Sequence, residues 1–494
     1  MRALPGIVLI VAGVGGLGLW SGCVNQADEV HQYREVLDQG LPKAEPLQPH
    51  ETLTLGRALL LANADNEQLA SQGETYLQAL IAKSRAFSAF LPTINFQPDF
   101  TLEQAPKGNA ANTASAVATA TNPNPAAQSA SAGGYVQDGN VFRRFEAPVV
   151  GQASFSPRSI PLYQAAKIAI AQNRQLLIDA QQTILLNVAQ AYFQVLISNQ
   201  QVGVLQHSLK LQEERVKDLR ARLRMQLALG LDLNQALANE AATQVQLSQA
   251  LNDLRNARRM LGLLIGVGDL DNPLVNDIIS TGPAESMDDF VKRALAQRQD
   301  LVAAEEATKQ ARLAVKAAVD EYYPSVSLNV AGYLYRENYA DASKWAGLLV
   351  ANLPIYSGGA IKADVRNAWS HLRQAALFES YLRREVLENV RTAYDNLATA
   401  GLELADLERE VTAANQAYIQ ARQLEKNGLA IPLDVLTAQD TLLNAQLQYA
   451  NEAFSRTLFR FNLIRAVGDF NPLTPTHLNW TSPPPPDQFA GHEQ

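Results

Sequence analysis

Apolar and polar residues alternate one by one in four short stretches of the chain. In the first stretch Ile94, Phe100 and Leu102 fall on one side, and polar residues such as Asn95 and Thr101 fall on the other. A period of two is typical of a β-strand with one apolar face, and about ten residues is the length of a strand that crosses a membrane. We predict such strands at about 93–102, 143–156, 325–335 and 344–356.

Long stretches between and after these strands have apolar residues at every third or fourth position instead. The first begins at about Pro157 and meets no strong breaker before Met225, which corresponds to roughly 100 Å of helix at 1.5 Å per residue. A return helix follows from Leu233 to Ile265. The same pattern after the second strand pair has coiled-coil spacing. We predict helical hairpins at about 157–265 and 359–467.

The chain is an internal duplication with a period of roughly 200 residues, far longer than the repeats of solenoid proteins. Tyr192 recurs as Tyr394, and the Gly230-Leu231 pair recurs as Gly428-Leu429. Because residues 23–50 show no strong period, we expect them to form a surface tether. The predicted segments are 1–22, 23–50, a first repeat over 51–266, a second repeat over 267–470 and a Pro-rich tail over 471–494.

Each repeat supplies only two strands, and four strands are too few to close a barrel. Open sheet edges in the hydrocarbon of a membrane would leave backbone N–H and C=O groups unsatisfied, at a cost of several kcal/mol each. The strands must therefore be shared among several copies. The predicted fold class is an α+β membrane protein: a duplicated protomer that gives four strands to an oligomeric barrel and has long antiparallel coiled-coil helices.

The single cysteine, Cys23, lies at the end of a secretory signal. Arg2 is followed by an apolar run and then by small residues that end at Gly22, as before a cleavage site. This arrangement resembles the bacterial lipoprotein signal, which implies that residues 1–22 are removed and that Cys23 carries a covalent lipid. The alternative is an uncleaved membrane anchor with a buried free thiol. Val24 replaces the aspartate that retains lipoproteins in the inner membrane, so the resemblance implies the outer membrane.

Composition argues against several other functions. The net charge is −8, and Lys and Arg are interspersed with acidic residues, so no basic stripe is available for nucleic-acid phosphates. The six histidines have no metal-ligand spacing, and neither a phosphate-binding loop nor a nucleophile elbow occurs. We therefore expect no catalytic residue, no metal and no nucleic-acid partner. A lipid-anchored hydrolase would also need a compact core, which the periodicity does not supply.

The duplicated pattern over about 51–470 resembles the TolC-like outer-membrane efflux and secretion proteins. The motifs that carry the resemblance are the Leu353–Gly359 segment before the second long helix and the Gly428-Leu429 pair with Asp434 beyond it. The resemblance implies a homotrimer with a twelve-stranded barrel in the outer membrane and a helical tunnel in the periplasm. It also implies three partners: a periplasmic adaptor (membrane fusion) protein, an inner-membrane transporter and outer-membrane lipid.

The same resemblance assigns the tips of the two helical hairpins to adaptor docking. The tip residues are Gly230 and Leu231 in the first repeat and Gly428 and Leu429 in the second. Each glycine also has an ordinary structural explanation, because a helix commonly ends with a glycine in the left-handed conformation. We expect both roles to coincide at the tips.

Asp434 lies just after the second tip and has two interpretations. In the first turn of a helix, its carboxylate stabilises the helix N-terminus; as the counterpart of the family's constriction residue, it forms a cation-selecting ring in a trimer. Three positions depart from the family's pattern: Ala236 stands in place of a partner aspartate, Glu425 in place of a gating tyrosine, and Thr437 in place of a second aspartate. These departures indicate a gate that is built differently.

The predicted function is that of a passive exit duct for an efflux pump or secretion machine. The alternative is a lipid-anchored periplasmic scaffold of coiled helices without a pore, in which the β-like segments form soluble hairpins. The lengths and alternation of the predicted strands favour the duct. A tunnel of this kind is a shared conduit, so selection of cargo among drugs, metal ions and proteins belongs to the pump.

Overall fold

The computed structural model describes residues 25–48, 50–104, 136–138, 141–268, 270–275, 286–336 and 344–471. The predicted signal peptide 1–22, Cys23 and the tail beyond 471 lie outside the described residues. The chain divides into a helical unit, Met1–Leu77, Arg174–Val302 and Tyr381–Gln494, and a sheet unit, Gln78–Asn173 and Ala303–Ser380. No helix in the described ranges is both long enough and apolar enough to cross a membrane.

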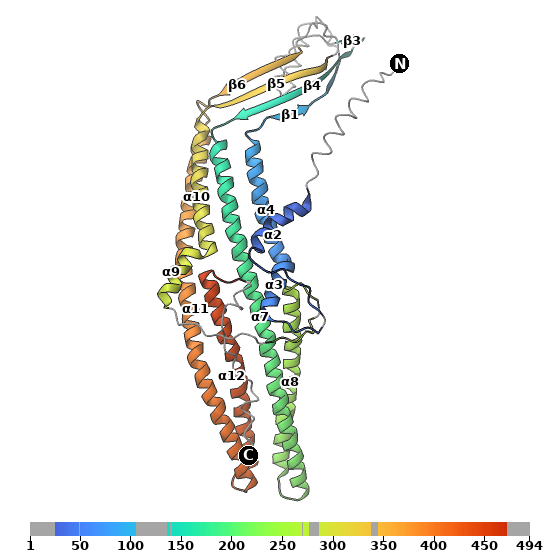
Figure 1. Ribbon diagram of the computed structural model, residues 1–494, viewed down its shortest axis with the longest axis vertical. Coiled ribbons are helices and arrows are strands. Elements are labelled where there is room, and N and C mark those ends of the chain that lie inside the picture. Colours follow the sequence, from blue (N-terminus) through green and yellow to red (C-terminus); the bar gives the residue numbers. More distant parts are fainter. Residues whose placement is uncertain are drawn as a thin grey trace. The chain divides into compact units, whose positions relative to one another are not determined.

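The strands of the sheet unit form one antiparallel sheet (Figure 1). Its path runs β1-β4-β5-β6, and β2 and β3 also pair with β4. The pairing of β4 with β5 joins the two sequence repeats, because β4 belongs to the first and β5 to the second. The strands are β1 Thr93–Phe96, β2 Asp99–Gln104, β3 Val136–Asp138, β4 Val141–Phe155, β5 Ser325–Arg336 and β6 Trp345–Asn352.

The stretch predicted as one strand at 93–102 is divided into β1 and β2 by Gln97 and Pro98. Pro98 has no N–H to donate and cannot continue the ladder. The backbone N–H of Gln97 still donates to the carbonyl oxygen of Pro148 at 3.0 Å. The prediction of an uninterrupted strand is therefore wrong here, and this edge of the sheet has a break at Pro98.

The pairing register places a row of large apolar residues on one face of the sheet. Val326 lies opposite Phe155 of β4 and Ala351 of β6, and two residues further on Leu328 lies opposite Leu349 of β6. This face is exposed in the single chain, and an apolar surface of such extent indicates an apolar environment. Its exposed members are Ile94, Phe96, Phe155, Val326, Leu328, Val330, Trp345 and Leu349.

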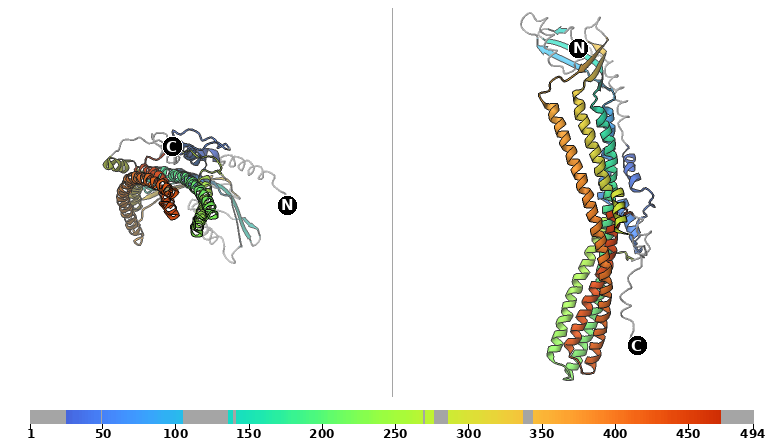
Figure 2. Two further views of the ribbon diagram at one scale, coloured as in Figure 1. Left: turned by 90° about the horizontal axis from the view of Figure 1, so that it is seen from below. Right: turned by 90° about the vertical axis from the view of Figure 1, so that its left-hand side faces the viewer.

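Long helices make up most of the remaining described chain (Figures 1 and 2). Each repeat contains one long hairpin, α7 with α8 in green and α11 with α12 in orange to red. α4, α7, α10 and α11 each contribute residues to both units. The helices are α2 Gln26–Leu37, α3 Leu55–Asp65, α4 Glu67–Ser88, α7 Ser159–Arg224, α8 Gly230–Leu264, α9 Met287–Gln297, α10 Gln299–Val319, the 3-10 helix Asp320–Tyr322, α11 Ala360–Lys426 and α12 Pro432–Val467.

Segment 23–50 contains the helix α2, where the sequence predicts only a tether. The side chain of Asn25 caps the helix by accepting a backbone N–H, and Tyr33 and Leu37 are buried. The ring of Tyr33 lies so close to Gly73 of α4 that a Cβ there would be 2.4 Å from a ring carbon. A short helix with so few apolar residues shows no clear period in the sequence, which is why the prediction is wrong.

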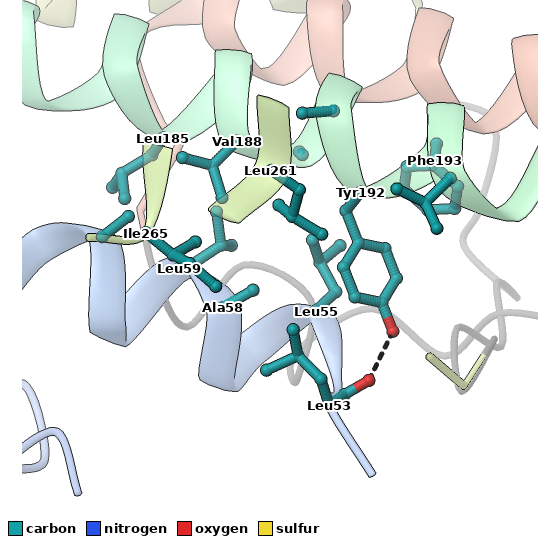
Figure 3. Packing of buried hydrophobic residues seen from close by; sticks show 14 of the residues in the cluster. Leu53, Leu55, Ala58, Leu59, Leu185, Val188, Tyr192, Phe193, Leu261 and Ile265 are labelled. Carbon is teal, nitrogen blue, oxygen red and sulfur yellow. Dashed lines mark hydrogen bonds between the residues drawn. The ribbon is translucent and has the colours of Figure 1, made fainter. Parts of the chain in front are cut away.

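The main hydrophobic core of the helical unit gathers α3, α7, α8 and α12 around Tyr192 (Figure 3). The Tyr192 hydroxyl lies 2.8 Å from the carbonyl oxygen of Leu53 and 2.6 Å from that of Val275. The neighbouring Phe193 packs against Phe461 with ring centroids 5.8 Å apart. Tyr192 is therefore a packing residue with a satisfied hydroxyl, as its place in an apolar stripe predicts.

Candidate functional site: the hairpin tips

The two long hairpins have turns of the same conformation. One residue in each turn is left-handed: Gln226 in the first, with φ 61°, and Gly428 in the second, with φ 74°. The residues that follow, Leu227 and Leu429, each donate a backbone N–H to the carbonyl oxygen five residues earlier, at 2.8 Å. These bonds close the C-terminus of the incoming helix, and the two turns are structural equivalents.

This equivalence corrects the pairing of the tips that the sequence suggests. The structure pairs Gln226, and not Gly230, with Gly428. Gly230 and Leu231 open α8, so that Gly230 begins a helix and does not end one. The left-handed role predicted for a helix-ending glycine is confirmed at Gly428 and is wrong at Gly230, because Gln226 occupies that position in the first turn. Leu429 and Leu231 both lie on the exposed surface of the tips.

Asp434 has a counterpart in the first hairpin. Its carboxylate accepts the backbone N–H of Ile431 at 3.1 Å, and the carboxylate of Asp232 accepts the backbone N–H of Leu229 at 3.2 Å. Each aspartate thus stabilises the N-terminus of a return helix. Ala236 is not the counterpart of Asp434; it is buried in the small core cluster at this end of α7 and α8.

Both turns present apolar side chains to solvent. Leucines dominate this surface, and the most exposed, Leu429 and Leu227, are 75% and 72% exposed. Clustered exposed leucines are unusual unless a partner covers them. The exposed apolar residues of the two turns are Met225, Leu227, Leu229, Leu231, Leu429, Ile431 and Leu433.

Glu425 joins the two hairpins next to the tips. Its carboxylate accepts two hydrogen bonds from the guanidinium of Arg215 on α7, both at 2.5 Å, and a third from Arg222 at 3.4 Å. The side chains of Glu425 and Arg215 are 4% and 10% exposed, and that of Arg222 is 30% exposed. Asp218 completes the group with an ion pair to Arg222 at 3.0 Å.

A bidentate pair of this kind has a defined geometry and a strong directional preference. It fixes the last turn of α11 against α7, so the departure from the family's pattern at Glu425 is an ion-paired residue of the hairpin interface. Burial raises the pKa of the neighbouring Tyr418 hydroxyl, against the opposing effect of Arg422 and Arg215. Thr437, the other departure on this side, is exposed and donates its hydroxyl to the carbonyl oxygen of Leu433 at 2.9 Å.

Sequence reasoning missed Arg215, Arg222 and Asp232. Asp232 had a readable signal, because Leu-Asp-Leu at 231–233 matches Leu-Asp-Val at 433–435. The two arginines had none, since they meet Glu425 across more than 200 residues of chain. Within the described residues, no group of three or more His, Cys, Asp or Glu side chains could hold a metal ion.

Comparison with known proteins gives a family match. Residues 290–469 match the Outer membrane efflux protein family. The outer membrane efflux protein BepC of Brucella suis is 24% identical over 62% of this chain and 67% of its own length. The outer membrane protein TolC of Escherichia coli is 24% identical over 59% of this chain and 62% of its own. The matched region thus covers about two thirds of these relatives or less.

Solved structures extend the likeness in fold. The outer membrane protein VceC of Vibrio cholerae has a TM-score of 0.70 at 19% identity, with 84% of this chain and 96% of that chain covered. The CmeC outer membrane channel of Campylobacter jejuni has a TM-score of 0.71 at 18% identity, with 85% and 86% covered. The resemblance predicted from the sequence is confirmed: the chain is related to the outer membrane efflux proteins over residues 290–469 and has the fold of TolC-like outer-membrane channels.

Proposed function

We propose that this chain is the outer-membrane exit duct of a tripartite efflux pump or a type I secretion system. It passively conducts substrates across the outer membrane and carries out no enzymatic step of its own. The observation that carries the proposal is the presence, in one chain, of a sheet with an exposed apolar face and of two long helical hairpins. In a periplasmic scaffold without a pore, that apolar face would be exposed to water, which is unfavourable.

The free edges of the sheet support a barrel shared among copies. β6 on one side and β1 with β2 on the other have no further strand partner among the described residues. Such edges are costly in hydrocarbon, and pairing β6 of one copy with the β1–β2 edge of the next removes all of them. A homotrimer with a twelve-stranded barrel satisfies this condition in the outer membrane. A lipid on Cys23, just ahead of α2, adds an anchor to the same membrane.

The exposed leucines of the turns support docking of a periplasmic adaptor protein, with an inner-membrane transporter beyond it. Leu231 and Leu429 each sit next to a turn whose backbone is fixed by the bonds described above, so the apolar side chains are presented on a firm base. Gly428 lies in the second turn itself, and Gly230 opens α8 just beyond the first turn. An apolar partner surface gains the full transfer energy of each leucine that it covers.

The carboxylates of Asp434 and Asp232 support a cation-selective entrance. In a trimer they supply six negative charges at the end of the hairpins, and rings of carboxylates favour cations in narrow pores. Because both groups also cap helices, their positions are fixed by the backbone. The cation preference belongs to the duct, whereas selection of the cargo belongs to the pump.

The test combines negative-stain electron microscopy with planar-bilayer recording on the purified full-length protein. We expect a hollow threefold particle longer than about 100 Å, the length of the helices alone, and stepwise conductance that prefers cations. Asp434→Ala with Asp232→Ala should lower the cation preference. Glu410→Ala, which removes an exposed carboxylate of α11 away from the tips, should leave the cation preference unchanged. A compact monomeric particle without conductance would favour the scaffold and overturn the duct.

A further inference from the structure

The free edges of the sheet carry their backbone groups in matching positions. On β6, the Lys344 carbonyl oxygen accepts the backbone N–H of Tyr333 in β5 at 2.9 Å. Even-numbered residues of β6 therefore bond to β5, and odd-numbered ones point their N–H and C=O groups to the free edge. On the other side, the Gln97 N–H donates to the carbonyl oxygen of Pro148 in β4, so the even-numbered residues of β1 and β2 point outward. In the proposed barrel, the seam where β6 of one copy meets this edge of the next copy joins odd residues to even ones.

The two faces of the sheet require the same pairing. Odd-numbered residues of β6, such as Trp345 and Leu349, lie on the apolar face, and so do even-numbered residues of β1, such as Ile94 and Phe96. Joining odd to even continues that face across the seam, whereas a slip of one residue turns it over. The strands also run in opposite directions, because β1 follows the helix α4 and β6 leads back to α11. The seam is therefore antiparallel, and its possible registers differ by steps of two residues.

Closure of the barrel limits the register further. Within one copy, a line perpendicular to the strands joins Thr93, Gln152, Asn329 and Leu348. Twelve strands about 4.8 Å apart have a circumference of about 58 Å. A strand tilt of about 35–45° then requires a total stagger of about 40–58 Å, or about 12–18 residues at about 3.3 Å each. Three equal seams share this stagger, so that each seam advances by about four or about six residues.

Two registers remain. The step leads away from the helices, because residues 89–92, just before β1, belong to no strand. An advance of four residues places Leu348 of one copy opposite Gln97 of the next copy, and an advance of six places it opposite Asp99. All three positions lie on the face opposite to the apolar row. The faces of the sheet alone therefore do not separate the two registers.

Charge favours the four-residue step. Asp99 is exposed at the edge and lies opposite Glu146, which already has an ion pair with Arg336 at 3.1 Å. The four-residue step makes the exposed Lys344 of the neighbouring copy a diagonal neighbour of Asp99 on the same face, which is within reach of a long side chain. The six-residue step instead places the apolar Leu348 opposite Asp99 and Lys344 about 13 Å further along the strand.

We propose that β6 of each copy pairs with β1 and β2 of the next copy in one register, with Leu348 opposite Gln97 and Lys344 beside Asp99. This register deepens the proposed function and rests on it, since the seam exists only in a shared barrel. All of β6 is then paired, because its last residue lies opposite the first residue of β1.

The register also carries one strand across the break at Pro98. Trp345 and Phe100, which are 68% and 57% exposed in the single chain, become a cross-seam pair on the apolar face. Gly347 lies opposite Pro98, and the Trp345 ring leans over Gly347, since a Cβ at this glycine would be 3.4 Å from a ring carbon. The seam lacks one hydrogen bond at this point, because Pro98 has no N–H to donate. The pairs on both sides of the proline are formed.

Disulfide cross-linking of the full-length protein in outer-membrane fractions tests the register. Leu348→Cys with Gln97→Cys places two cysteines in a non-hydrogen-bonded pair, with Cα atoms about 4.5 Å apart, which suits a disulfide. Covalent dimers and trimers should appear on a non-reducing gel. Leu348→Cys with Asp99→Cys or with Thr93→Cys provides matched controls on the same face, which should cross-link at least about tenfold more slowly because their Cα atoms are too far apart. Each single variant controls for links through Cys23.

A second measurement tests the charge pair through the temperature at which trimers dissociate in detergent. Lys344→Gln should lower that temperature in the wild-type background and change it little in the Asp99→Asn background, because the pair contributes only when both charges are present. Faster cross-linking at Asp99 or Thr93 than at Gln97, no cross-link in threefold particles, or additive effects of the two charge changes would overturn the register. A monomeric wild-type particle counts against the duct itself, and microscopy detects it before any cysteine is introduced.

Discussion

Glu425→Gln isolates the charge that joins the two hairpins. Removing one partner of a buried ion pair costs about 3–5 kcal/mol, because the other charge stays buried without compensation. Asp218 lies 3.9 Å from Arg215 and Arg222 is 30% exposed, so both arginines recover part of their stabilisation. We therefore expect a loss of about 3 kcal/mol in the local contact, which corresponds to about a hundredfold shift toward the separated tips.

The assay is amide hydrogen exchange in peptides that cover 212–224 and 418–430, measured on the purified protein. Exchange there should accelerate by about a hundredfold, while peptides around the Tyr192 core keep their rates. Glu410→Gln neutralises an exposed glutamate on the same helix and should leave these exchange rates unchanged. Glu425→Arg combined with Arg215→Glu should restore much of the protection. If Glu425→Gln exchanges like Glu410→Gln, the ion pair does not hold the hairpins together and the reasoning is refuted.

Four further substitutions are expected to act elsewhere. Gly73→Ala places a Cβ 2.4 Å from a ring carbon of Tyr33; it should cost about 1–3 kcal/mol and speed limited proteolysis within 25–48. Gly428→Gln should destabilise its turn by about 1 kcal/mol because φ is positive, whereas Gln226→Gly should not, as thermal unfolding can show. Burial and then nearby Glu403 raise the pKa of Glu452. A raised folded pKa gives stability that is present below the ordinary glutamate pKa and lost as pH rises through the folded value. Glu452→Gln should therefore raise the melting temperature at neutral pH and flatten its pH dependence.

The long elements were predictable because each is a one-dimensional pattern. In α7 or β5, the position of a residue in the repeating pattern decides whether it faces other side chains or solvent. The spacing of apolar residues alone therefore locates the helix and the strand. The same logic predicts the shared barrel that we propose, since free sheet edges follow from the number of strands. The helix α2 was not predicted, because its two buried residues, Tyr33 and Leu37, are too few to define a period.

The tips were predicted less well, although a consistent offset was present. Tyr192 and Tyr394 differ by 202 residues, and so do Gln226 and Gly428. Matching by residue type joined Gly230 to Gly428 and broke that offset. A glutamine such as Gln226 can adopt the left-handed conformation at modest cost. Residue type at a turn is therefore a weaker criterion for matching the two repeats than the spacing along the chain.

The contacts of Glu425 could not be read from the sequence. Its partners lie on another hairpin, and nothing in the period of α7 distinguishes Arg215 from the exposed arginines around it. Long-range ion pairs depend on how helices rotate about their axes when they pack, which is set by many side chains together.

In the shared barrel that we propose, the break at Pro98 bears on how newly made chains pair with one another. Before a chain joins that barrel its sheet edge is unpaired, and unpaired edges in water recruit unrelated strands and seed aggregates. The proline leaves only Thr93–Phe96 and Asp99–Gln104 as separate, short ladders on that edge. A foreign strand gains few hydrogen bonds from either, whereas a strand that accommodates the interruption gains both. Pro98 thereby disfavours indiscriminate pairing and makes the first encounter between protomers selective.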